Sequence, residues 1–318
     1  MLQNINYKLE KISKMFSVSP YLFRSYNKDI IGTKRTHYSQ LSNISGWDLY
    51  ELLKVFIDKN KNYQVKADSK QVYRFENLDF DDKNRIVSVW FCVGVYGIKT
   101  DIIDIKTGSV DFEKAEENAE IIKYFMYFFV PRDYDEAIAL TSNYRSNGVK
   151  TLFYLLFSDY VSYKTNQKLQ MNPLSYDKAF KSWLDARTTE IRCTKFSGCR
   201  DITDQITLLG HDEQELVFKP KKNKSLGKLR DFVSNGDKLQ VIEVLSKTSG
   251  VIKCVVEMDG KQRTFRLGNN AGNILCEIEL DENVDIINGV PEFKSMQKWC
   301  KGITNEYAKR MYPGLTIG

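Results

Sequence analysis

The chain of 318 residues lacks the features that would assign it directly to a class of enzyme or metalloprotein. Its two histidines, His37 and His211, are distant in sequence from any cysteine. Among the six cysteines only Cys193 and Cys199 are close together, so the paired short spacings of zinc sites are missing. The sequence therefore predicts no metal and no cofactor. Without a dense cysteine framework, the chain is expected to be reduced and cytoplasmic.

Long apolar runs are missing as well. The most apolar windows, residues 87–98 and 125–130, are far shorter than the roughly 20 residues that a membrane helix requires. Residues 1–16 mix Lys, Glu and Asn with Leu and Ile, unlike the uninterrupted apolar segment of a secretory signal. The sequence therefore predicts a protein with no membrane span.

The composition, with 42% hydrophobic and 28% charged residues, is typical of a folded protein. A chain of this length is expected to form two or three compact modules. We predict an α+β fold with mixed sheets and flanking helices. The predicted modules are an N-terminal α+β module at residues 1–118, a central β-β-α-β-α-β module at 119–200, and a basic module with a β-meander and a terminal helix at 205–318.

Hydrophobic periodicity predicts the individual elements. In the first half of the chain we expect a helix at 47–57, strands within 86–105, a short solvated helix at 111–120, a sheet-centre strand at 121–130 and a helix at 149–160. In the second half we expect a helix capped by Ser175, a strand at 216–219, a helix from Ser225 to Gly236, strands at 239–245, 251–258 and 263–267 forming the meander, and a helix starting at Pro291.

Positive charge is concentrated in one region. The net charge is +6, yet residues 219–266 alone carry 12 basic and 5 acidic residues. Such clustering predicts contacts with nucleic-acid phosphates, and Phe265 on the predicted hairpin is expected to stack on a base. The predicted nucleic-acid-binding residues are Lys219, Lys221, Lys222, Lys224, Lys228, Arg230, Lys261, Arg263, Phe265 and Arg266. A solvated lysine face, or pairing with the acidic residues 277–285, would explain the same pattern.

One further set of residues suggests chemistry. Asp101, Asp104 and Lys106 lie on a strand-like run, in which Asp104 and Lys106 would share a face. Carboxylates beside a lysine are used in metal-assisted phosphodiester cleavage. A nuclease is therefore an alternative, although alternating polar residues are equally typical of the solvent face of a strand.

The middle of the chain resembles a group of bacterial proteins. The order of residues 121–131, the turn at 143–148, the following helix and the Asn-Pro-Leu at 172–174 resemble uncharacterised proteins of prophages and phage-defence islands. The similarity covers residues 90–200 and includes no chemical motif. It implies a setting in phage defence or on a mobile element, and it gives no residue a catalytic role.

The sequence therefore favours a non-enzymatic nucleic-acid-binding protein, acting as a defence or mobile-element accessory or effector. Nucleic acid that leaves the protein at high salt would support this hypothesis. The first alternative is an oligomeric scaffold or sensor subunit that uses its aromatic surface and the helix at 291–312. The second alternative is the metal-dependent nuclease.

Overall fold

The computed structural model describes residues 15–27, 37–145, 147–174, 183–194, 215–222, 224–233, 237–246, 250–258, 260–267, 275–315 and 317. The chain forms two compact units, each built from separate segments. Unit 1 contains the described residues up to Leu22, together with Asn172–Val290 and Lys301–Ile317, and unit 2 contains Phe23–Met171 and Pro291–Cys300. The fold is a sheet-dominated form of α+β. The division into three modules at residues 118–119 and 200–205 stays a prediction.

Unit 2 is centred on an antiparallel sheet. Its strands lie in the order β3 (Gln64–Lys66), β4 (Gln71–Asp81), β5 (Ile86–Val95), β8 (Glu120–Phe129) and β9 (Ala137–Tyr144). The predicted sheet-centre strand is confirmed as β8, since it pairs with β5 on one side and β9 on the other. Its residues Phe125 to Phe128 are fully buried.

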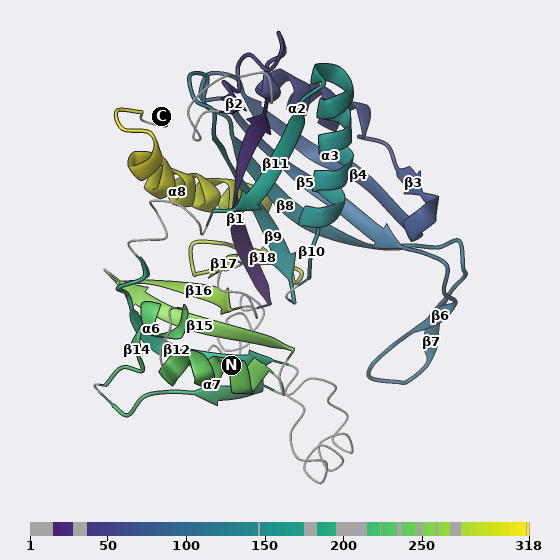
Figure 1. The fold of residues 1–318 in the computed structure, drawn as a ribbon. Coiled ribbons are helices and arrows are strands. Elements are labelled where there is room, and N and C mark those ends of the chain that lie inside the picture. The colour runs from purple at the N-terminus through teal and green to yellow at the C-terminus, as the bar shows by residue number, and fades with distance from the viewer. Residues whose placement is uncertain are drawn as a thin grey trace. The chain divides into compact units, whose positions relative to one another are not determined.

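Helices cover both faces of this sheet (Figure 1). On one face, Phe56 of α2 (Leu49–Lys59) and Phe153 of α3 (Lys150–Thr165) pack against Phe75 of β4. On the other face, Trp90 of β5 contacts Phe293 at the start of α8 (Phe293–Met311). Because neighbouring strand residues point to opposite faces, the nearly continuous apolar sequence of β5 matches burial on both sides.

The remaining elements of unit 2 are short. They are β2 (Tyr38–Ser39), η1 (Ala67–Ser69), β6 (Thr100–Ile103), β7 (Val110–Lys114), β10 (Asn147–Gly148) and β11 (Lys168–Pro173), whose last residues lie in unit 1. The helix expected at 111–120 is wrong, because β7 pairs with β6 in a separate two-stranded ribbon. The chain reverses between these strands at Gly108, whose φ of 72° belongs to a turn.

Unit 1 is centred on a second run of antiparallel strands. Their order is β13 (Glu215–Phe218), β12 (Arg187–Thr194), β15 (Val251–Met258), β16 (Lys261–Leu267) and β17 (Leu275–Glu279), and the first residues of β1 (Phe16–Tyr26) pair with β17. The other elements are β14 (Gly227–Lys228), α6 (Arg230–Val233), α7 (Asp237–Ser246), β18 (Ile286–Ile287) and β19 (Val290–Pro291). The strand pairs whose register is given above are antiparallel in both units, whereas we expected sheets that mix parallel and antiparallel strands.

Three expectations for this region are wrong. Residues 239–245 form part of α7 rather than a strand, so the meander consists of β15, β16 and β17. Within α7, Ile242 is buried while Val241 and Val244 are exposed, which is a helical and not an alternating pattern. The helix expected from Ser225 to Gly236 begins later, because residues 227–228 form β14 and the helix α6 covers Arg230–Val233, while residues 234–236 lie outside the described residues. Pro291 lies in β19, and α8 begins at Phe293.

Other helix predictions are confirmed. The helix at 47–57 is α2, the helix at 149–160 is α3, and Met296, Cys300, Ile303 and Tyr307 form the buried stripe of α8. The start of the helix capped by Ser175 lies outside the described residues. Among the helices that the structure describes, none is both long and apolar enough to cross a membrane.

Candidate nucleic-acid interface

Four lysines protrude from the edge of the sheet in unit 1. β13 and β14 both pair with β12, since Phe218 lies opposite Ile191 and Gly227 lies opposite Thr188. The described residues between them, 219–222 and 224–226, leave the ladder and form a loop at this edge. We call these residues the lysine loop. It contains Lys219, Lys221, Lys222 and Lys224 and no acidic residue.

The backbone of the lysine loop is held at several points. The Lys224 amide donates to the Lys221 carbonyl at 2.9 Å, and the Leu226 amide donates to the Thr188 carbonyl at 3.1 Å. The guanidinium of Arg187 donates to the Lys224 carbonyl at 3.4 Å. These bonds fix the path of the loop while its lysine side chains remain in solvent.

The four lysines of the loop differ in their partners. Lys219 forms an ion pair of 3.3 Å with Glu190, a half-buried acid of β12. Lys221, Lys222 and Lys224 are exposed, and among the described residues none of them has an ion-pair partner. Three ammonium groups of this loop are thus available to an anion.

Further cations lie beside the loop. Arg187 is directly opposite Lys228 across β12 and β14. Like charges in this position repel each other, and a bound anion would reduce the repulsion. Asp185 reduces it in part, because its carboxylate accepts from Lys228 at 3.1 Å and pairs with Arg230. The Lys228 bond and the two positive charges lower the pKa of the Asp185 carboxyl.

Sequence reasoning missed Arg187. It lies 32 positions before Lys219, outside the basic region, and only the register of β12 with β14 brings it to the loop. A lone arginine at the start of a strand carries no signal by itself.

The predicted basic hairpin has a different role. Arg263 is nearly buried, and its guanidinium lies 5.5 Å from the Trp183 ring centroid and 3.3 Å from Glu306. Lys261 pairs with the same Glu306 at 2.6 Å. Glu306 therefore compensates two of the predicted phosphate-binding residues.

Phe265 and Arg266 are also engaged within the sheet. The Phe265 side chain is 1% exposed, so the prediction that it stacks on a base is wrong. Its ring packs 6.3 Å from Trp183, because alternation along β16 turns it toward the core. Arg266 lies 3.9 Å from Glu277, a buried acid that also pairs with Lys253 at 2.8 Å. The position of Arg266 in the basic region is therefore better explained by pairing with the acidic residues 277–285 than by binding of nucleic acid.

The nuclease candidates lie on the β6–β7 ribbon. β6 ends at Ile103, so Asp104 and Lys106 belong to the turn, and the prediction that they share a strand face is wrong. Asp104 Oδ1 accepts from the amides of Lys106 and Thr107 at 2.6 and 3.1 Å. Asp101 lies opposite Glu113. Across the described part of the chain, no three His, Cys, Asp or Glu residues are placed to hold a metal ion.

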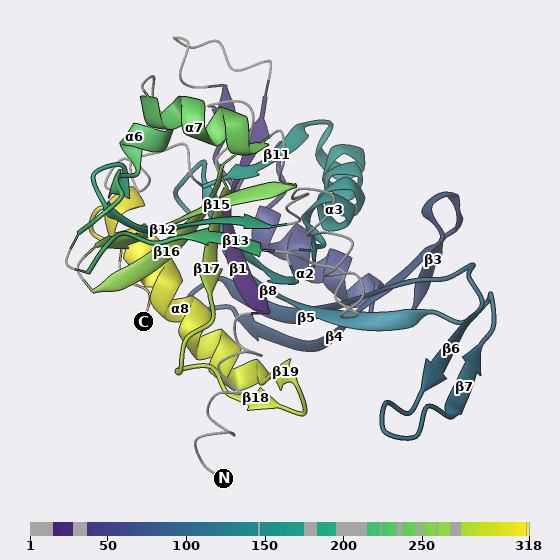
Figure 2. The ribbon, with the colours of Figure 1, turned by 90° about the horizontal axis from the view of Figure 1, so that it is seen from below.

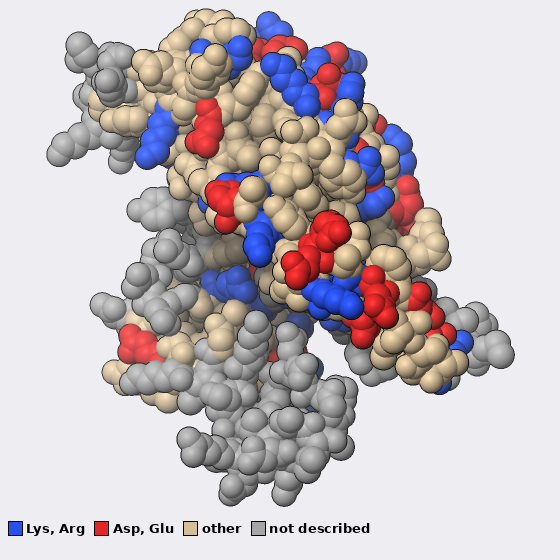
Figure 3. Space-filling view, turned by 90° about the vertical axis from the view of Figure 1, so that its right-hand side faces the viewer, with Lys and Arg blue, Asp and Glu red and all other residues tan. Residues whose placement is uncertain are grey.

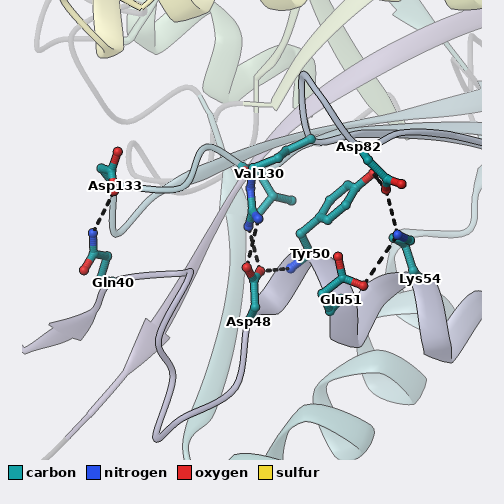
Figure 4. A network of polar contacts seen from close by, with 9 residues as sticks. Gln40, Asp48, Tyr50, Glu51, Lys54, Asp82, Val130 and Asp133 are labelled. Carbon is teal, nitrogen blue, oxygen red and sulfur yellow. Dashed lines mark hydrogen bonds and ion pairs between the residues drawn. The ribbon is translucent and has the colours of Figure 1, made fainter.

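A second polar cluster joins the start of α2 to the sheet of unit 2 (Figure 4). The two terminal nitrogens of Arg85 donate to the Asp48 carboxylate at 2.6 and 2.8 Å, and Arg85 Nε donates to the Val130 carbonyl at 2.7 Å. Tyr50 donates to Asp82 at 2.8 Å, and burial together with Asp82 raises its pKa. These groups satisfy one another, so the cluster is a structural anchor.

One described face of the molecule carries mixed charge. On the face drawn in Figure 3, Lys and Arg side chains alternate with Asp and Glu over the described surface. The lysine loop differs because its cations follow one another without an acid between them. It is therefore the best candidate for an anion interface. No protein-family model matches the chain, and no curated protein is significantly similar to it in sequence.

Proposed function

We propose that this protein binds the phosphate backbone of nucleic acids through the lysine loop, without a cofactor and without catalysis. The observation that carries the proposal is the loop itself, an acid-free segment held out from a sheet edge between two strands that pair with β12. Arg187, Lys228 and Arg230 extend the basic surface beside it. The resemblance of residues 90–200 suggests that the protein acts in phage defence or on a mobile element.

The chemistry of the loop favours backbone contacts over base recognition. Ammonium groups on flexible side chains act as point charges toward phosphates, and their binding energy comes mainly from the release of counterions. The only aromatic residue proposed to stack on a base, Phe265, is buried. We therefore expect binding that depends weakly on sequence and strongly on salt.

The test is the salt dependence of binding in a triple variant, K221A/K222A/K224A. Labelled duplex DNA, single-stranded DNA and RNA of equal length serve as probes in fluorescence anisotropy. For duplex DNA, loss of three phosphate contacts should reduce the slope of log K against log salt by about 2.7, at about 0.9 for each contact. Between 50 and 200 mM salt this difference amounts to about 40-fold in affinity.

The matched control is K83A/K168A/K309A, which removes three exposed lysines from other parts of the chain. The control should keep the parental slope within the error of the fit. A triple loop variant with the parental slope would overturn the proposal, and so would a parental protein that binds none of the three probes.

A second function is favoured by a different observation. The β6–β7 ribbon carries large apolar side chains in solvent, as interaction surfaces do. The β6–β7 ribbon is therefore the candidate interaction surface for the alternative function as an oligomeric scaffold.

A further inference from the structure

A two-stranded ribbon extends from the sheet of unit 2. It begins where the Gly97 amide donates to the Glu116 carbonyl at 2.6 Å, and we call residues 97–116 the arm. β6 and β7 pair only with each other among the described strands. In two views the arm lies apart from the other elements of its unit (Figures 1 and 2). Isolated two-stranded ribbons are marginally stable in water, so a ribbon of this kind benefits from a partner.

The arm exposes apolar side chains on both faces. Ile102 and Phe112 are directly opposite each other and are 51% and 50% exposed. Ile103 and Val110 form a second pair with the same exposure, and Ile105 in the turn is 92% exposed. Single exposed apolar residues are ordinary on protein surfaces, whereas a contiguous set marks an interaction site.

One face of the arm is acidic as well as apolar. Asp101 lies directly opposite Glu113, and alternation along β6 places Asp101 on the face of Ile103, while β7 carries the extra residue Asp111 at the register shift between Ile102 and Ile103. Like charges in this arrangement destabilise a ribbon, and Lys99, 3.3 Å from Glu113, compensates only one of them. The whole arm carries five acids and three lysines. A cation supplied by a partner would stabilise this face.

The complementary surface is present in unit 1. Val217 and Phe218 of β13 are 39% and 40% exposed on opposite faces of the sheet, and the lysine loop follows them directly. The segment at residues 217–226 combines apolar side chains with four lysines and no acid, whereas β13 itself begins with the exposed Glu215. It therefore matches the arm in both apolar character and charge.

We propose that the arm of one copy of this protein docks on β13 and the lysine loop of a second copy. Ile103 and Val110 would pack on Val217, while Asp101 meets the lysines of the loop. The contact joins two different surfaces, so it is head-to-tail, and repetition gives a ring or a filament. The docked arm and nucleic acid would compete for the same lysines.

The test uses a charge-reversed arm, D101K/E113K, and a charge-reversed loop, K221E/K222E/K224E, in sedimentation velocity. The parental protein should show a mass that rises with concentration from the 37.0 kDa monomer. Each variant alone should self-associate with a dissociation constant raised ~10-fold or more. Assembly should return when the two variants are mixed, and also when both sets of changes are combined in one chain.

The control variant, E120K/D159K, makes the same change in net charge at two exposed acids outside the arm and should assemble like the parent. A parental protein that stays monomeric at all concentrations would overturn the inference. Assembly of the loop variant at parental strength would do so as well, since it would show that the lysine loop does not contribute to the contact.

The arm variant also separates this inference from the proposed function. D101K/E113K should keep the parental salt slope in the anisotropy assay, because its lysine loop is intact. If this variant lost nucleic-acid binding together with self-association, the result would count against an independent role for the arm.

Discussion

The ion pair between Asp48 and Arg85 provides a quantitative test of how unit 2 is stabilised. Arg85 is 8% exposed, and both terminal nitrogens of its guanidinium donate to the Asp48 carboxylate. Asp48 Oδ1 also accepts from the Tyr50 amide at 2.8 Å and so caps α2. In the substitution Asp48→Asn, the amide oxygen can still cap the helix. The negative charge beside Arg85 is lost.

The expected cost is large because it leaves a buried cation unpaired. Breaking a buried ion pair from one side costs about 3–5 kcal/mol, and the partial exposure of Asp48 places the value near the lower limit, about 3 kcal/mol. If the free energy of local opening falls by about 3 kcal/mol, the backbone amides of α2 should exchange roughly 160-fold faster. The control Asp58→Asn, also on α2, breaks an exposed pair with Lys61 just beyond the helix and should cost less than about 0.5 kcal/mol.

The same pair predicts a dependence on pH. Burial by itself would raise the pKa of the Asp48 carboxyl, but the bonds and charge of Arg85 outweigh burial and lower it. The folded state therefore releases this proton more readily than the unfolded state. Its stabilisation is complete above about pH 4 and is lost as the pH falls through the folded-state pKa. The difference between parent and variant should shrink in that range.

Hydrogen exchange of α2, read by mass spectrometry, measures this effect within one segment of a two-unit protein. The parent, Asp48→Asn and Asp58→Asn are compared at pH 7, and the first two again at pH 3. Equal exchange in the two variants at pH 7 would refute the reasoning, because the buried pair would then contribute no more than an exposed one.

Two further predictions concern unit 1. Glu277→Gln should remove about 3 kcal/mol or more of stability, since Glu277 is buried between Lys253 and Arg266; unchanged amide exchange in β15 and β16 would contradict this. Burial raises the pKa of Cys254 and of Cys276 to about 12, so neither thiol should react with iodoacetamide at pH 8 until urea is added. Labelling of either cysteine in the native protein, detected by peptide mass spectrometry, would show that it is accessible as a thiolate.

The spacing of apolar residues was sufficient to predict an element where the residues of that element alone indicate which of its sides is buried. The spacing of Leu49, Leu52, Leu53 and Phe56 predicts the buried side of α2, and all four are buried. The apolar run that became β8 could be placed at a sheet centre for the same reason. The pattern of apolar residues failed at residues 239–245. Their β-branched residues favour a strand, but the segment is part of the helix α7, in which Ile242 is buried and Val241 and Val244 are exposed.

The candidate interface was predictable in composition but not in detail. The lysines of 219–224 are adjacent in sequence, so their clustering was visible there. Which of them are available depends on strand register, because Glu190 reaches Lys219 only once β12 and β13 are paired. The same applies to Phe265, whose burial depends on which side of β16 faces the core.

The segmented construction of the two units affects how this protein can fold during synthesis. Pro291–Cys300 complete unit 2 and Lys301–Ile317 complete unit 1, so both units lack a segment until these residues have been translated. From Met171 to Pro291 the ribosome adds 120 residues (291 − 171), which takes roughly 6–24 s at about 5–20 residues per second. During that time the sheet of unit 2 is without the part of α8 that packs on Trp90. We therefore expect the nascent chain to expose this aromatic surface of the sheet until the start of α8 has been translated.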